Sequence, residues 1–255
     1  MRAEEKFTPD FRTAHVVPSP NHDARAHAID MIVLHYTDEN AADALARLCD
    51  GAAAAKVSAH YLVHEDGRVD QLVPEARRAW HAGVSSWQGE RDNNSRSIGI
   101  EIVNLGHEHG YPDFPDKQID AVIALCRDII ARHTVRADHV LAHSDIAPAR
   151  KQDPGEKFPW ARLAAAGVGL WVEPAPIVEG AVLARGAEGG RVNALQTALA
   201  QYGYGVTATG RYDAATETVV TAFQRHFRPA RVDGIADAST LATLRHLLTA
   251  SSALA

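Results

Sequence analysis

The sequence has little cysteine and no long hydrophobic run. It holds two cysteines, Cys49 and Cys126, and both lie on apolar helical patterns instead of in the paired spacing of a metal site or redox motif. We therefore interpret both as small, buried hydrophobic side chains. No run of about 18 or more apolar residues is present, so we expect no transmembrane segment.

An excess of positive charge is also missing. The 26 lysines and arginines face 32 aspartates and glutamates, which gives a formal net charge of -6. A nucleic-acid partner or an anionic membrane surface calls for a basic stripe, so we expect neither partner. The N-terminal residues lack the charged and then apolar segments of a signal peptide. Because a targeting segment can be absent from the sequence in hand, this does not decide against export.

What is present is the composition of an ordinary globular protein, 46% hydrophobic and 23% charged. Strand and helix patterns alternate in the first part of the chain. Residues 31–36 (MIVLHY) read as a buried strand, residues 59–73 as a hairpin around an Asp-Gly turn, and residues 114–133 as a helix. We expect an α/β domain over residues 1–172, with helices on at least one face of its sheet.

A change of composition separates this domain from a second one. Residues 173–190 are rich in proline, glycine and alanine without sustained periodicity, which is typical of a linker. Three short amphipathic helices follow within residues 191–255, and Asp213 and Asp237 stand where the N-caps of two of them belong. We expect a small all-α domain there.

Two strand patterns place polar side chains where a site could form. His35 lies at the end of the strand over residues 31–36, and in SIGIEIV (97–103) Glu101 lies on the face opposite the isoleucines, because successive side chains alternate across a strand. A third segment, HSDIAPARKQDPG (143–155), holds His143, Lys151 and Asp153 on a stretch with two prolines.

These residues can be combined into a zinc hydrolase. Catalytic zinc takes three protein ligands from His, Asp or Glu and keeps a fourth position for water, which His35, His143 and Asp153 can satisfy. Glu101 can then act as the general base and Lys151 as the cation that stabilises an oxyanion. From spacing alone, purely structural roles for these residues remain open. His143 can be a structural histidine, Asp153 a turn cap, and Glu101 part of a solvated face or an ion pair.

The motifs favour the catalytic interpretation. The segments VLHYT, SAHYLVHEDGRV, AWHAGVSSW, NSRSIGIEIVN and HSDIAPARKQDPG occur in the order and spacing of the zinc-dependent N-acetylmuramoyl-L-alanine amidases. Residues 28–172 resemble this family, which is related to peptidoglycan recognition proteins and amidase-type phage lysozymes. The resemblance implies a mixed central sheet flanked by helices. It also implies Zn²⁺ on His35, His143 and Asp153, with Glu101 and Lys151 catalytic.

The chain differs from two branches of this superfamily. It has Ala59 where the recognition proteins and phage lysozymes carry a catalytic tyrosine, and its third ligand is Asp153 instead of a cysteine. This places it with the bacterial amidases that process or recycle cell wall, and leaves the proton transfer to Glu101. The resemblance also suggests that Tyr36, His81 and Ser144 line the substrate groove.

The C-terminal segments LQTALAQYGY, TGRYDAATETVVTAFQRHF and VDGIADASTLATL resemble the three-helix peptidoglycan-binding module. Such a module holds an enzyme on the polymer and raises its local substrate concentration. The alternative is that this copy only packs against the catalytic domain. The combined expectation is a hydrolase that acts on peptidoglycan or muropeptides in the periplasm or at the outer membrane. Its rivals are a wall-binding or sensing protein without activity, and a cytoplasmic recycling enzyme.

Overall fold

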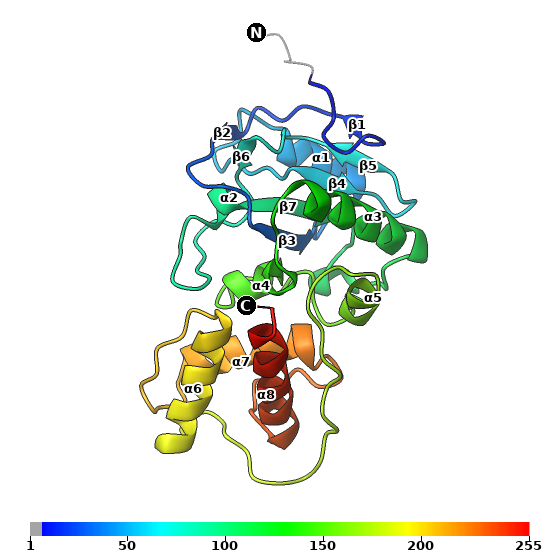
Figure 1. The fold of residues 1–255 in the computed structure, drawn as a ribbon. Helices are drawn as coiled ribbons and strands as arrows, with labels where there is room; N and C mark the ends of the chain where they lie inside the picture. The colour runs from blue at the N-terminus through cyan, green and yellow to red at the C-terminus, as the bar shows by residue number, and fades with distance from the viewer. Residues whose placement is uncertain (1–6, 255) are drawn as a thin grey trace.

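The computed structural model describes residues 7–254. An upper lobe is built around a β-sheet and a lower lobe around three helices, and the short helix α4 lies where the two lobes meet (Figure 1). The strands are β1 His15–Val16, β2 His22–Ala24, β3 Met31–Tyr36, β4 Tyr61–Val63, β5 Val69–Gln71, β6 Arg77–Ala79, β7 Ser97–Ile102 and β8 Val140–Ala142. The α-helices are α1 Ala41–Leu48, α2 Asn93–Arg96, α3 Asp116–Arg132, α4 His143–Ile146, α5 Trp160–Ala165, α6 Gly190–Tyr202, α7 Ala214–Phe227 and α8 Ala238–Ser252.

The main sheet has six strands in the order β1-β5-β4-β7-β3-β8. β7 and β8 run parallel to β3 on its two sides, β4 runs parallel to β7, and β5 is antiparallel to β4. β2 and β6 form a separate antiparallel pair. The expected mixed sheet flanked by helices is therefore confirmed.

The two faces of β3 and β7 have different partners. Ile98, Ile100 and Ile102 join Ile32 and Leu34 in one apolar cluster, which α3 completes with its own apolar residues at helical spacing. The residues between them face the other way, and the parallel register sets His35 directly beside Glu101. The alternation expected from the sequence thus puts isoleucines in the core and charged chemistry on the opposite face.

That opposite face is covered by two different elements. α1, whose N-cap Asn40 accepts hydrogen bonds from two backbone amides, packs Ala44 and Leu48 against Leu62 and Val103. The lower lobe covers another part, where residues of the sheet and of the C-terminal helices form one cluster. Its members from the upper lobe include Met31, Val33, Leu141 and Ile146, and those from the lower lobe include Leu199, Tyr204, Phe223 and Phe227.

The C-terminal lobe consists of α6, α7 and α8. Asp213 and Asp237 cap α7 and α8 through the backbone amides of Thr216 and Thr240, as the sequence predicted. The packed part of the lobe begins inside the segment expected as a linker, because Leu183 pairs with Ala236 through two backbone hydrogen bonds. None of the helices within residues 7–254 is long and apolar enough to cross a membrane.

Candidate active site

Three side chains that can bind a metal meet at one edge of the sheet. His35 lies near the end of β3, and His143 directly follows β8 as the first residue of α4. Because β3 and β8 are parallel and Leu34 pairs with Ala142, the next residue of each strand reaches the same edge. Asp153 comes from the loop after α4, and its backbone oxygen accepts a hydrogen bond from the amide of Ser144.

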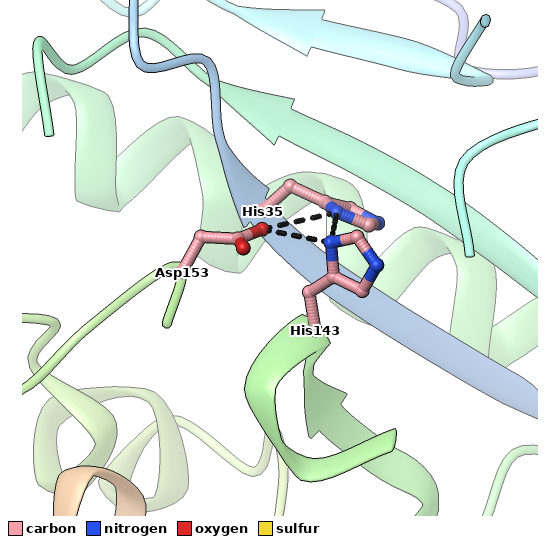
Figure 2. Close-up of side chains that lie close together, drawn as sticks. All are labelled: His35, His143 and Asp153. Atoms are coloured by element: carbon pink, nitrogen blue, oxygen red, sulfur yellow. Dashed lines mark hydrogen bonds and ion pairs between the residues drawn. The ribbon is translucent and has the colours of Figure 1, made fainter. Parts of the chain in front are cut away.

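The three donor atoms form a nearly regular triangle (Figure 2). His35 Nδ1 lies 2.8 Å from His143 Nδ1 and 3.2 Å from Asp153 Oδ2, and His143 Nδ1 lies 3.0 Å from Asp153 Oδ2. Three ligands of a tetrahedral zinc ion at about 2.0–2.2 Å are separated by about 3.3 Å. Two imidazole nitrogens and one carboxylate oxygen at these separations fit a catalytic zinc ion.

The charge states of the ligands also suit a cation. Burial, and then the neighbouring His143, lowers the pKa of His35 to about 4, so this imidazole is neutral at neutral pH. Burial acts to raise the pKa of Asp153, but the charges and hydrogen bonds of His143 and His35 bring it well below its usual range. A neutral imidazole and an ionised carboxylate are the forms that bind metal.

The second ring nitrogen of His35, Nε2, is the first member of a chain of hydrogen bonds. His35 Nε2 lies 3.0 Å from His81 Nδ1, and His81 Nε2 lies 3.2 Å from the hydroxyl of Ser97, which donates to the backbone oxygen of Asn93. With Nδ1 of His35 used as a ligand, its Nε2 carries the proton and donates to His81, which in turn donates to Ser97. Each member therefore fixes the tautomer and the ring orientation of the one before it.

A glycine makes room for this chain. Gly99 lies on β7 behind His81, and a Cβ atom at that position would overlap the imidazole ring. Burial, and then the neighbouring His35 and His60, holds the pKa of His81 well below its usual range, which keeps the ring neutral. His81 is 8% exposed and forms part of the cavity wall. The two nitrogens of its ring form hydrogen bonds with His35 and Ser97.

Glu101 lies beside the three candidate ligands, and one of its carboxylate oxygens has no hydrogen-bond partner among residues 7–254. It is 7% exposed, and no residue between 7 and 254 forms a hydrogen bond with its buried Oε2 atom. Burial, and then the charge of Asp153, raises the pKa of Glu101 to about 8. An unpartnered carboxylate oxygen with a raised pKa, facing a cavity, is typical of a group that transfers protons.

A cavity of about 590 Å³ opens over these groups. Lys151 lines it with an exposed side chain, and the amide of Lys151 donates to the backbone oxygen of Ala147, which fixes the loop that also carries Asp153. Tyr36 also lines the cavity, and its hydroxyl lies 2.9 Å from His107 Nδ1. In the described chain Ser144 is not part of this lining and its side chain is fully buried. Ser144 contributes its backbone amide to Asp153 instead of a groove-facing hydroxyl.

Three cationic residues of the cavity besides Lys151 were not singled out from the sequence. Arg150 donates to the backbone oxygens of Ala82 and Val84, and Arg47 and Lys56 also line the cavity. The signal for Arg150 was its place between His143 and Lys151 in one motif, whereas Arg47 and Lys56 belong to unremarkable helix and loop patterns. Trp87 is fully buried and packs edge-on against Tyr202 and Tyr204, so it is a core residue.

Comparison with known proteins identifies both lobes. The family model described as N-acetylmuramoyl-L-alanine amidase matches residues 25–156, and the model of a peptidoglycan binding domain matches residues 188–244. The N-acetylmuramoyl-L-alanine amidase AmiD of Escherichia coli is 41% identical over 236 residues, which cover 86% of this chain and 82% of that protein. The 1,6-anhydro-N-acetylmuramyl-L-alanine amidase AmpD of Citrobacter freundii is 37% identical over 157 residues, 62% of this chain and 80% of that protein.

Solved structures agree with the sequence relatives. The structure of Escherichia coli AmiD in complex with the substrate anhydro-N-acetylmuramic acid-L-Ala-D-γ-Glu-L-Lys is similar to this chain with a TM-score of 0.73 and 38% identity. The match covers 89% of this chain and 92% of that one, so it includes both lobes and not the sheet domain alone.

Proposed function

Because the chain belongs to the N-acetylmuramoyl-L-alanine amidase family, we propose that His35, His143 and Asp153 hold a catalytic zinc ion and that Glu101 and Lys151 act beside it. The reaction is hydrolysis of the amide bond between the lactyl group of N-acetylmuramic acid, or its anhydro form, and the L-alanine of the stem peptide. The observation that supports the site most strongly is the triangle of three buried donor atoms, 2.8 to 3.2 Å apart, next to the unpartnered oxygen of Glu101.

The ligand set defines what the protein contributes. A zinc ion, when bound, supplies Lewis acidity and lowers the pKa of water toward neutrality. His35 offers a neutral imidazole, His143 offers a second imidazole nitrogen and Asp153 offers the negative charge. His81 and Ser97 hold the ring of His35 in the required orientation. His35, His143 and Asp153 are all buried at the ends of β3 and β8 and on the adjoining loop. The proposed ligands are therefore in place before the substrate binds.

Glu101 is the proposed proton carrier. Glu101 lines the cavity beside His35 and its Oε2 atom has no hydrogen-bond partner among residues 7–254, so its carboxylate can accept a proton from the attacking water and deliver it to the amide nitrogen that leaves. Glu101 must be ionised to accept the proton. Burial favours its neutral form, whereas a zinc ion bound by the three neighbouring residues would favour the ionised form. No tyrosine stands at residue 59, where this chain has a buried alanine.

Lys151 is the proposed stabiliser of the oxyanion. Its ammonium group lies on the cavity wall, close enough to Glu101 and to His35 to affect the pKa of each. A fixed cation aimed at the carbonyl oxygen lowers the energy of the tetrahedral state, in which that oxygen carries negative charge. Arg150 donates its hydrogen bonds to backbone oxygens and is therefore less free for this role.

The proposed substrates are peptidoglycan and its muropeptides. The relatives are named for anhydro substrates or were solved with one, and the C-terminal module favours attachment to the polymer. Tyr36, which lines the cavity, is proposed to contact substrate. The geometry gives His81 mainly the task of holding His35, and Ser144 lies outside the groove.

We place this activity in the periplasm or at the outer membrane, because a wall-binding module is useful where the polymer is. A cytoplasmic enzyme that acts on small anhydro-muropeptides is the second candidate, and the similarity of residues in the upper lobe to Citrobacter freundii AmpD favours it. Locating the natural gene product in fractionated cells decides between the two compartments.

Product analysis tests the proposed function. Purified sacculi are incubated with zinc-loaded protein and, in parallel, with protein treated with a chelator. We expect free stem peptides with a new L-alanine amino terminus in the zinc-loaded sample alone. Intact sacculi with protein bound to them would instead identify a wall-binding protein that has lost the reaction.

A further inference from the structure

A buried carboxylate links the two lobes next to the proposed zinc ligands. Asp145 belongs to α4, two residues after His143, and its side chain is fully buried. Its Oδ1 accepts a hydrogen bond of 2.6 Å from the hydroxyl of Tyr204, which follows α6. Its Oδ2 accepts one of 2.7 Å from Nδ1 of His226 on α7 and one of 2.8 Å from the amide of Ala142.

The two donors from the lower lobe are held firmly. His226 is 1% exposed, and its ring lies between Trp160 of α5 and Phe227, with ring centres 3.7 and 3.8 Å away. Because a carboxylate only accepts, Nδ1 of His226 is the protonated nitrogen and donates. Tyr204 packs edge-on against Trp87 at 5.2 Å, so its hydroxyl is aimed at Asp145 by the core shared between the lobes.

α4 depends on such outside contacts because it is short. It has four residues, and one helical turn cannot hold itself together in water, since nucleation fixes several dihedral angles for a single hydrogen bond. The bond from the amide of Ala142 to Asp145 closes the first turn, and Tyr204 and His226 hold the other side of that carboxylate. The orientation of α4 is thus set partly by the C-terminal lobe.

Two of the three proposed ligands depend on this turn. His143 is the first residue of α4, and the amide of Ser144 donates 3.0 Å to the backbone oxygen of Asp153. A rotation of α4 therefore displaces one imidazole directly and one carboxylate through the backbone. His35, on β3, is not connected to Asp145 in this way.

We infer that the C-terminal lobe is part of the hydrolytic site, in which Tyr204 and His226 act as positioning residues that hold Asp145, and through it His143 and Asp153, in the geometry that binds zinc. This rests on the proposed function, because it assumes that these two residues are ligands. It goes beyond tethering to the wall, since it concerns hydrolysis of substrates too small to bind both lobes. It also makes zinc affinity depend on residues of the lower lobe.

Removal of one hydroxyl group tests the inference. Tyr204→Phe deletes the donor to Asp145 and keeps the ring. Tyr202→Phe is the control, because Tyr202 is also a buried tyrosine whose ring packs on Trp87, but its hydroxyl forms no hydrogen bond within residues 7–254. The full-length variants are compared by competition with a chromogenic chelator for zinc, by kcat on a soluble anhydro-muropeptide, and by melting of the zinc-free protein.

We expect Tyr204→Phe to weaken zinc affinity by about tenfold and to lower kcat, because partners behind a ligand typically contribute that much. Tyr202→Phe should leave both quantities within about twofold of the original chain. If both variants change zinc affinity equally, or if Tyr204→Phe lowers only the melting temperature, the contacts at Asp145 serve stability alone and the inference is wrong.

A second pair of variants guards against misfolding. His226→Asn places an amide donor near the position of Nδ1, whereas His226→Leu removes the donor and keeps an apolar side chain. We expect the Asn variant to bind zinc more tightly than the Leu variant, and equal affinities would contradict the inference. Original chain that binds no zinc or releases no stem peptide would reject the proposed function, whereas active original chain with unchanged Tyr204→Phe protein rejects only the positioning role.

Discussion

The two faces of β3 and β7 have different roles: one packs in the apolar core and the other carries the candidate site. On one face, alternate residues such as Ile98, Ile100 and Leu34 pack under α3 and hold the sheet together. On the other, the residues between them include the proposed zinc ligand His35, the proposed proton carrier Glu101, and Gly99, which leaves space for the ring of His81. The same six-residue strands therefore supply stability and chemistry at neighbouring positions, and substitutions on the two faces should have separable effects.

The largest expected effect is on the catalytic face. Glu101→Gln keeps the shape of the side chain and removes its ability to accept a proton, so we expect kcat to fall by about 10³-fold. Zinc affinity and melting temperature should change little, because the carboxylate is not among the three ligands. Stem-peptide release, zinc competition and thermal melting measure the three quantities. Near-normal turnover with zinc bound would show that another group carries the proton.

The matching change on the core face is Ile100→Ala, one residue away. It leaves a cavity under α3, and we expect the free energy of unfolding to fall by about 3 kcal/mol. The kcat of the protein that remains folded should stay close to that of the original chain. Denaturant titration and turnover at a temperature well below melting test this, and a loss of kcat as large as that of Glu101→Gln would end the separation of the faces.

The stabilisation of the fold by zinc should not depend on the core face of the sheet. At a free concentration about one hundred times its Kd, an ion that binds only the folded chain stabilises it by about 2.7 kcal/mol. We expect the same gain in Ile100→Ala protein, because the ligands lie on the other side of the sheet. Melting with and without zinc measures it. A gain that disappears in the core variant would mean that the two faces are strongly coupled.

The smallest expected effect concerns the residue behind His35. His81→Ala removes the acceptor that fixes the ring of His35, and we expect zinc affinity to fall by about tenfold. His139→Ala is the matched control, because His139 is also buried but donates from Nδ1 to the backbone oxygen of Asp30 and contacts none of the three proposed ligands. If the two variants lose the same affinity, His81 does not position the ligand and a direct contact with substrate becomes the better explanation.

Much of the sheet domain follows from the sequence because its signals are local. Alternation in residues 97–103 placed Glu101 on the face opposite the isoleucines, and helical spacing placed α3. The order of the strands could not be predicted from local patterns, because β3 pairs with β7 and β8, which lie far from it in the chain. The ligand set rested on resemblance to a family, since fourteen histidines make accidental pairs common.

Other features needed the three-dimensional contacts. Residues 143–146 form a helical turn because Asp145 accepts from the amide of Ala142 and from the lower lobe, and the sequence does not reveal these contacts. The apolar core shared by the two lobes could not be predicted from the sequence either. An apolar helix face looks the same whether it packs inside a three-helix bundle or against a sheet, so Phe223 and Phe227 gave no sign of their partners.

The shared core bears on how such proteins can be recombined. Met31, Val33 and Leu141 of the sheet domain belong to the same cluster as Phe223 and Phe227 of the helical lobe. A chimera that exchanges residues 191–255 for another three-helix module therefore uncovers apolar surface on the recipient, unless the donor module offers side chains of matching shape at α6 and α7. For module exchange this chain therefore behaves as one unit, because a junction within residues 173–190 separates two lobes that share one apolar core.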